Sequence, residues 1–173
     1  MASREPIVEL LQRQPFARGM SQDHLATLVA HTTEVVFAED QVIFAAGRPS
    51  SSLYLVLSGC VCVEVRTPVY AVCVQVVGPG EAFGWSSLLE DHYTLFQVRA
   101  LSSVTALCID AHHLLEACQE DPRFGFELMR RVLAMVAGRV QAVEARLGEF
   151  CGIAGAARPR REAACGSNPI VRL

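Results

Sequence analysis

The sequence predicts a mainly β fold with flanking helices: an antiparallel, jelly-roll-like β-roll followed by a long C-terminal dimerisation helix. Between Glu34 and Asp110, short β-rich runs are punctuated by Gly, Pro, Ser and Asp, which is typical of antiparallel strands joined by turns. From Pro122 onward, apolar residues recur at alternating gaps of three and four, which indicates a long helix. Two shorter helical segments, 7–14 and 22–31, precede the strands, and Ser21 is a suitable N-cap for the second.

Length and charge limit the classes of protein that fit. The chain of 173 residues can bury one core, and we expect one domain over 1–151 and a disordered tail over 152–173. A formal net charge of -3 gives no general attraction to nucleic acids or anionic membranes. No run reaches the ~18 apolar residues of a membrane helix, and the amino terminus has no secretory-type apolar segment. We therefore expect a cytoplasmic protein with no membrane partner.

The first clear pair of strands carries cysteines. In the run Cys60–Arg66, the valines at 61, 63 and 65 share the expected core face, and the residues between them, Glu64 included, face away from it. The next strand repeats this scheme, with valines at 72, 74 and 76 on the core face and Cys73 and Gln75 on the other. A turn at Thr67–Pro68 would place Cys62 opposite Cys73.

This cysteine pairing suggests a redox switch or a thiolate metal site. The alternative is two free thiols on a half-covered sheet. The alternative is favoured because a metal needs more ligands and no histidine lies at a suitable spacing in these strands. The odd total of seven cysteines, without C-x-x-C spacing, also fits reduced thiols better than a disulfide framework.

Three glycines in seven residues, Gly78, Gly80 and Gly84, mark a tight turn between a strand and a short helix that starts at Trp85. Glycine adopts the backbone angles of such turns without a steric penalty. The first N–H groups of the helix, together with the hydroxyls of Ser86 and Ser87, would form an anion site. The alternative is a β-turn capped by serine.

The runs Phe44–Gly47, Leu53–Gly59 and Gly80–Gly84 resemble the cyclic-nucleotide-binding domain superfamily, the sensory part of catabolite-activator and Fnr-type regulators, over roughly residues 15–150. The resemblance implies a small, nucleotide-like ligand at the glycine loop, with a glutamate after the Phe-Gly pair holding the ribose and a later arginine pairing with the cyclic phosphate. The implied ligand-binding residues are Gly80, Glu81, Phe83, Gly84, Trp85, Ser86, Ser87, Tyr93 and Thr94.

Two of these positions depart from the pattern of the resembled family. Trp85 stands at the glutamate position and Thr94 at the arginine position, so that one N–H and one hydroxyl replace a carboxylate and a guanidinium. Ordinary cyclic AMP binding is therefore not expected. Arg99 does not replace the arginine, because it lies an odd number of residues from Thr94 and faces the other side of a regular strand; a bulge would change this.

The helix expected over 122–150 carries a heptad seam, which is typical of a helix that pairs with another helix. In the resembled family the corresponding helix is the dimer interface and closes over the nucleotide. Arg139 at a g position and Glu144 at the following e position support a parallel homodimer; the alternative is a helix that packs only on the roll. The seam residues are Phe126, Met129, Leu133, Val136, Val140, Val143, Leu147 and Phe150.

No catalytic arrangement is recognisable, and no cofactor or metal is expected. Gly84–Leu88 starts like a nucleophile elbow but has Leu88 where the second glycine is required. After Gly152 no two further helices follow, so a helix-turn-helix reader is not predicted, and DNA binding is not expected. The sequence predicts a non-catalytic ligand-sensing module; the alternatives are a degenerate docking subunit and a Crp/Fnr-type transcriptional regulator without its DNA-binding domain.

Overall fold

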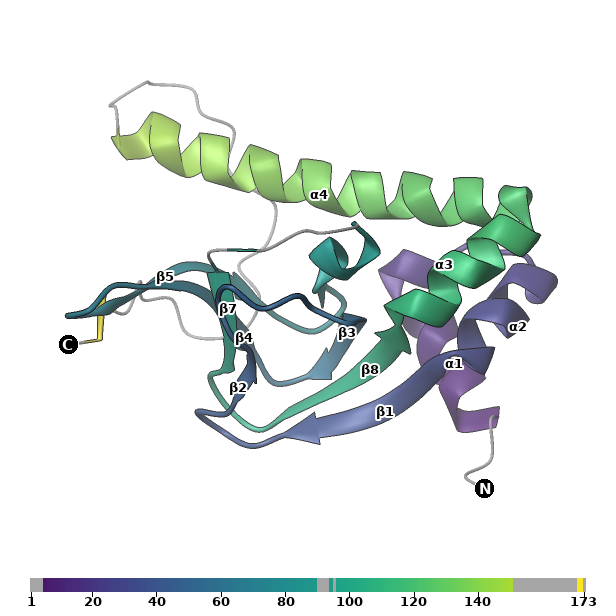
Figure 1. Cartoon of the computed structure of the whole chain (residues 1–173), viewed down its shortest axis with the longest axis horizontal. Coiled ribbons are helices and arrows are strands. Elements are labelled where there is room, and N and C mark those ends of the chain that lie inside the picture. The colour runs from purple at the N-terminus through teal and green to yellow at the C-terminus, as the bar shows by residue number, and fades with distance from the viewer. Residues whose placement is uncertain (1–4, 90–93, 95, 151–170, 173) are drawn as a thin grey trace.

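The computed structural model of the chain describes residues 5–89, 94, 96–150 and 171–172, and it confirms the expected β-roll (Figure 1). Two antiparallel sheets have the strand orders β1-β8-β3-β6 and β2-β7-β4-β5-β9. The strands are β1 (Thr32–Phe37), β2 (Val42–Phe44), β3 (Ser52–Ser58), β4 (Val61–Arg66), β5 (Ala71–Val77), β6 (Ala82–Phe83), β7 (Phe96–Ala100), β8 (Val104–Asp110) and β9 (Val171–Arg172). The helices are α1 (Glu5–Arg13), η1 (Pro15–Ala17), α2 (Gln22–Ala30), η2 (Trp85–Leu88), α3 (Ala111–Glu120) and α4 (Pro122–Phe150).

The helix starts follow local capping chemistry. The Ser21 hydroxyl accepts a hydrogen bond from the His24 amide at 3.2 Å, which confirms Ser21 as the N-cap of α2. At the start of α4, the Asp121 carboxylate accepts from the amides of Arg123, at 2.9 Å, and Phe124, at 3.3 Å. Pro122 is the first helical residue, as predicted, because proline has no amide hydrogen to satisfy there.

Strands β3 and β8 are buried on both faces. On one face, Leu53, Leu55, Leu107 and Ile109 pack against the helices. On the opposite face, alternate residues of the same strands meet the second sheet inside the roll. The roll interior consists of Val56, Val61, Val77, Phe83, Val98, Ala100, Val104 and Ala106.

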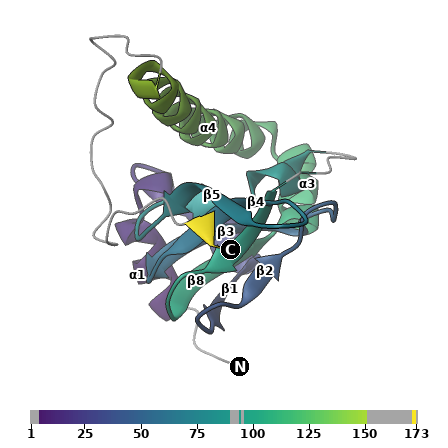
Figure 2. The ribbon, with the colours of Figure 1, turned by 90° about the vertical axis from the view of Figure 1, so that its left-hand side faces the viewer.

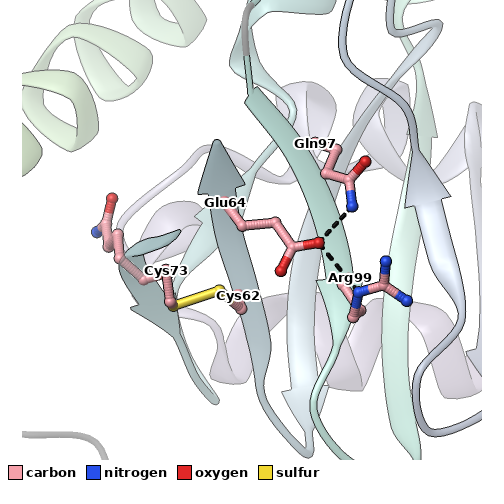
Figure 3. Close-up of a disulfide and its surroundings, with 6 residues drawn as sticks. Cys62, Glu64, Cys73, Gln97 and Arg99 are labelled. Carbon is pink, nitrogen blue, oxygen red and sulfur yellow. Dashed lines mark hydrogen bonds and ion pairs between the residues drawn. A yellow bond between two sulfur atoms is a disulfide. The ribbon is translucent and has the colours of Figure 1, made fainter. Parts of the chain in front are cut away.

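The outer face of β4 differs from the sequence prediction. Glu64 was expected to face solvent, but only 6% of it is exposed. Its carboxylate accepts hydrogen bonds from the Gln97 amide and, at 3.0 Å, from the Arg99 guanidinium, both on β7 (Figure 3). Arg99 also donates to the Asp40 carbonyl at 2.8 Å. The charge is tolerated in the sheet because these partners satisfy it.

Strand β5 contains a bulge that the sequence did not predict. In the hairpin formed by β4 and β5, Glu64 lies opposite Cys73, whereas the preceding residue of β4, Val63, lies opposite Gln75. Val74 is therefore an extra residue in β5, and the register shifts by one residue there. Cys62 consequently lies opposite Val76. The prediction that Cys62 lies directly opposite Cys73 is wrong, and so is the prediction that Val76 shares the core face with Val72.

The sulfur atoms of Cys62 and Cys73 nevertheless meet, and the structure joins them in a disulfide with a Cα–Cα distance of 5.9 Å (Figure 3). The favoured prediction of two free thiols is therefore wrong for this pair. Cys62 is also buried, with 1% exposed, although the alternation placed it on a half-covered face.

Helix α4 lies across the roll, and the β4–β5 hairpin extends beneath its distal half (Figures 1 and 2). Its first half is held by Phe124, Leu128 and Val132. These residues are buried in the core between the helices and the first sheet, called here the helix-side core. A polar network reinforces this contact: the Glu127 carboxylate lies 2.6 Å from the His24 ring nitrogen Nδ1 and 2.5 Å from the Arg131 guanidinium. Arg131 also donates to the carbonyls of Phe16, at 2.7 Å, and Arg18, at 3.0 Å.

Most of the described side chains of the heptad seam of α4 are exposed. Phe126 is 74% exposed, Leu133 68% and Val140 50%, while Val136 is partly packed against the core. Val143, Leu147 and Phe150 lie outside the described side chains.

Most of the tail expected over 152–173 lies outside the described residues. Its last described residues, Val171 and Arg172, form β9, which pairs with β5 and departs from the expectation of disorder. No helix in the described part of the chain is long and apolar enough to cross a membrane.

The Glu127 network generates a pH-dependent prediction. Hydrogen bonds from Arg131 and His24 hold the pKa of Glu127 below its usual value of 4.5. A lowered pKa in the folded state stabilises the fold above pH 4.5, and this contribution is lost as the pH falls through the folded pKa. Glu127→Gln should therefore lower the free energy of unfolding by about 1–2 kcal/mol at neutral pH.

The difference between Glu127→Gln and the wild type should shrink steadily below pH 4.5, as measured by denaturant unfolding across a pH series. Glu120→Gln, at the exposed end of α3, is the control and should change stability little at any pH. A loss of stability in Glu127→Gln that stays constant down to low pH would contradict the lowered pKa of Glu127.

Candidate functional site

The loop between β5 and η2 is closed by hydrogen bonds to itself and to β3. The Gly80 amide donates to the Val56 carbonyl, and the Val56 amide donates to the Glu81 carbonyl, both at 2.9 Å. The Glu81 carboxylate accepts from the Gly78 amide at 2.8 Å. The only carboxylate among the sequence-predicted ligand residues therefore closes its own loop, while Glu81 as a whole remains exposed.

Gly84 is required at the end of this loop by both conformation and space. Its φ is +83°, in the region that side chains rarely adopt. A Cβ atom there would lie 2.5 Å from the Ser52 carbonyl oxygen and 3.2 Å from the Tyr54 ring. Gly80 has the same φ, but the nearest atoms to a Cβ there belong to Pro15 at 3.6 Å. The close approach to β3 is thus specific to Gly84.

The segment after Gly84 is shorter and more closed than the anion site that the sequence suggests. η2 is a single 3-10 turn of four residues. The Ser87 amide donates to the Gly84 carbonyl at 3.0 Å, and the Ser87 hydroxyl donates to the same oxygen at 2.7 Å. These bonds favour the alternative interpretation, a turn closed by serine.

The aromatic residues on either side of Gly84 point into different cores. Phe83 is fully buried in the roll interior, where its ring stacks on Tyr54 with centroids 4.8 Å apart. Trp85 packs instead against the helix-side core and is half-buried. The structure therefore separates two residues that the sequence assigns to one site.

Thr94 is held by the turn that follows β2. Its carbonyl accepts from the Gly47 amide at 2.8 Å, and its hydroxyl accepts from the Phe96 amide at 3.1 Å. The run that ends at Gly47 is one of those on which the family resemblance rests. Tyr93 lies outside the described residues. Arg99 lies on the outer side of β7, where its guanidinium donates to the Glu64 carboxylate at 3.0 Å.

The sequence assigned Arg139 of α4 to the flank of the dimer seam and not to the candidate site. Its guanidinium donates a hydrogen bond to the Ala82 carbonyl in the glycine loop. Burial lowers the pKa of Arg139 to about 10, and the nearby Glu81 carboxylate acts in the opposite direction. The heptad assigned Arg139 to a g position facing a second subunit, but the structure turns it toward the roll. It links the loop directly to α4.

A cavity of about 510 Å³ lies at another part of the molecule, lined by Ala30, His31, Thr33, Ser52, Cys108, Asp110 and His113. The Asp110 carboxylate caps α3 by accepting from the His113 amide at 3.0 Å, and this bond is the largest cause of its lowered pKa. The His31 and His113 rings stack with centroids 5.5 Å apart. Across the described residues, no group of three or more His, Cys, Asp or Glu side chains is placed to hold a metal ion.

Comparison with known proteins identifies the family. The model of the cyclic nucleotide-binding domain family matches residues 34–121, which is just over half of the chain. A CRP-like cAMP-activated global transcriptional regulator of Mycobacterium tuberculosis is 25% identical over 123 residues, which are 70% of this chain and 55% of the regulator. This chain therefore spans little more than half of that relative.

Two further similar proteins are a longer enzyme, of which this chain matches a small part, and a domain of known structure. Glutaminase 2 of Bradyrhizobium diazoefficiens is 28% identical over 137 residues, which are 79% of this chain but only 21% of the enzyme. A cyclic nucleotide-binding domain from Methylobacillus flagellatus has the same fold, with a TM-score of 0.72 and 19% identity over 85% of this chain and 83% of that domain.

The two glycines with equal φ provide a matched test of the site geometry. Gly80→Ala should cost about 1–2 kcal/mol, the strain of a side chain at positive φ. Gly84→Ala should cost roughly 2 kcal/mol more, because the Ser52 carbonyl or the loop must also move. Denaturant unfolding of both variants measures the difference. Equal losses would contradict the close packing of Gly84 on β3.

Proposed function

This chain belongs to the cyclic nucleotide-binding domain family, and we propose that it is a non-catalytic regulatory module that senses a small ligand and passes the signal to α4. The single observation that carries this proposal is the hydrogen bond from Arg139 to the Ala82 carbonyl, which connects the family's ligand loop to the long helix. A ligand can shift α4 from one position to another only if its affinity for the loop differs between these two positions of the helix.

We place the ligand beside the loop 78–88 and Thr94. The ligand is a small, nucleotide-like molecule rather than cyclic AMP itself, because Trp85 and Thr94 provide neither the carboxylate for a ribose hydroxyl nor the guanidinium for a cyclic phosphate. Arg139 donates a hydrogen bond to this loop, and it would be displaced from Ala82 or recruited when an anionic ligand enters.

The exposed seam of α4 supports a homodimer. Phe126, Leu133 and Val140 present a long apolar stripe on the side of α4 opposite the roll. A second α4 with the same seam covers such a stripe with knobs-into-holes packing. Because α4 also contacts the ligand loop through Arg139, binding and subunit arrangement would be coupled.

A second candidate function is a structural or protein-docking subunit that has lost ligand binding. The replacements at Trp85 and Thr94 and the self-closed Glu81 carboxylate favour it. A third, a transcriptional regulator, is supported by the similarity to the M. tuberculosis regulator, of which this chain spans 55%. Ligand binding separates the first candidate from the second.

The ligand prediction is tested by thermal-shift and calorimetric titration with cyclic AMP, cyclic GMP, cyclic dinucleotides and a metabolite panel. A ligand at a hundred times its dissociation constant should stabilise the fold by about 2.7 kcal/mol. Cyclic AMP should not bind at micromolar strength. Any ligand found should change hydrogen exchange in α4 of the wild type and of Arg130→Met but not of Arg139→Met. No binding by any compound would favour the docking role.

The dimer prediction is tested by a charge in the seam. Val140→Glu should separate the subunits, because it buries two like charges at the two-fold axis. Light scattering should give about twice the 18.8 kDa chain mass for the wild type and the chain mass for the variant. Leu133→Glu should act alike, since Leu133 is more exposed still, while Gln141→Glu, one residue off the seam, should remain dimeric. A monomeric wild type would refute the proposed dimer.

A further inference from the structure

The bulge in β5 and the Cys62–Cys73 disulfide lie at the same place. Cys73 is the residue before the bulge, and its partner across the ladder is Glu64, two positions from Cys62 on β4. The two cysteines are therefore diagonal neighbours. Figure 3 shows the disulfide spanning the two strands beside Glu64, which accepts hydrogen bonds from Gln97 and Arg99.

The bulge brings these cysteines within bonding range. Diagonal neighbours on a regular antiparallel pair have Cα atoms about 7–8 Å apart, whereas a disulfide needs about 4.4–6.8 Å. The distance from Cys62 to Cys73 is 5.9 Å. The bulge makes the bond possible, and the bond in turn resists any return to regular pairing.

The same bulge decides which side chain enters the roll. Val63 packs against the roll interior, and Gln75 lies opposite it, so Gln75 shares that inner face. In a ladder without the bulge, Val74 would lie opposite Val63 and Gln75 would face outward. The register of β5 also bears on the glycine loop, because β5 continues directly into Gly78.

We propose that Cys62 and Cys73 are a reversible redox pair that holds the β5 bulge and so sets whether Gln75 or Val74 faces the inside of the roll. The oxidised form presents an amide, which can donate and accept hydrogen bonds, and the reduced form presents a valine. The consequence for ligand recognition rests on the proposed sensory function; the switch of strand face does not.

The chemistry is thiol–disulfide exchange with a low-molecular-weight disulfide such as oxidised glutathione. The Cys73 thiolate attacks one sulfur of that disulfide and releases the first glutathione thiolate. The Cys62 thiolate then attacks the Cys73 sulfur, forms the internal disulfide and releases the second. The protein loses two electrons and two protons, and the oxidant becomes two thiols. Cys73 is the entry point because it is half-buried, whereas only 1% of Cys62 is exposed.

The first experiment maps the thiols of the full chain in glutathione buffers of increasing reducing strength, by differential alkylation and peptide mass analysis. The 62–73 linkage should form in oxidising buffer, disappear in reducing buffer and return on re-oxidation. Cys118→Ser is the matched control: Cys118 is also half-buried, burial raises the pKa of its thiol, and its loss should leave the linkage unchanged. Absence of the linkage in oxidising buffer would overturn the proposal.

The second experiment observes the strand face by NMR without any ligand. Oxidised protein should show contacts between the Gln75 side-chain amide and the Val63 methyl groups, and reduced protein should show Val74 methyl contacts instead. Amide exchange at 74–76 should be about tenfold faster or more after reduction. Cys73→Ser should match the reduced wild type in both buffers, and Cys62→Ala provides a second variant if Cys73→Ser folds poorly. Retention of the Gln75–Val63 contact in reduced protein and in both variants would overturn the proposal.

A third measurement separates this inference from the proposed function. Any compound that binds should do so with a dissociation constant that differs at least about tenfold between oxidised and reduced protein, and Gln75→Val should remove that difference. A redox-driven change of strand face without any ligand would retain the inference and refute the sensory function. Equal affinity in both redox states would overturn the link between the bulge and the site.

Discussion

The double burial of β3 and β8 is the constraint on which the remaining structure depends. Because both faces of these strands are apolar, one face must be covered by the second sheet and the other by helices. The helices are therefore confined to one side of the first sheet, and α4 starts there. The glycine loop packs on β3 through Gly84, so the loop and the long helix are brought together by the same pair of strands.

The fold was largely predictable because its signals are local. Turn residues between short β-rich runs, an N-cap at Ser21 and a proline at the first position of α4 each correspond to one physical preference. The failures occurred where one strand depends on another. A single extra residue at Val74 reverses the faces of everything after it in β5, and no local pattern in a run of valines reveals which residue is extra.

The candidate site was predictable only in part. The glycine positions follow from backbone conformation, which sequence records well, and Gly84 is placed as expected. The role of Arg139 depends on a contact across 57 positions of sequence, and its place in the heptad indicated a second subunit instead. Glu64 likewise read as a surface residue, because alternation does not show that Gln97 and Arg99 would converge on it.

The Glu127 network gives α4 the mechanics of a lever. The helix has 29 residues, and its ion-paired anchor at Glu127 and Arg131 lies close to one end. The part beyond Arg131 extends for roughly 28 Å at 1.5 Å per residue. A tilt of about 10° around that anchor moves the far end by roughly 5 Å, while the base shifts by only a fraction of this. A rearrangement of the loop that tilted α4 by this angle would displace its tip by about the length of one helical turn.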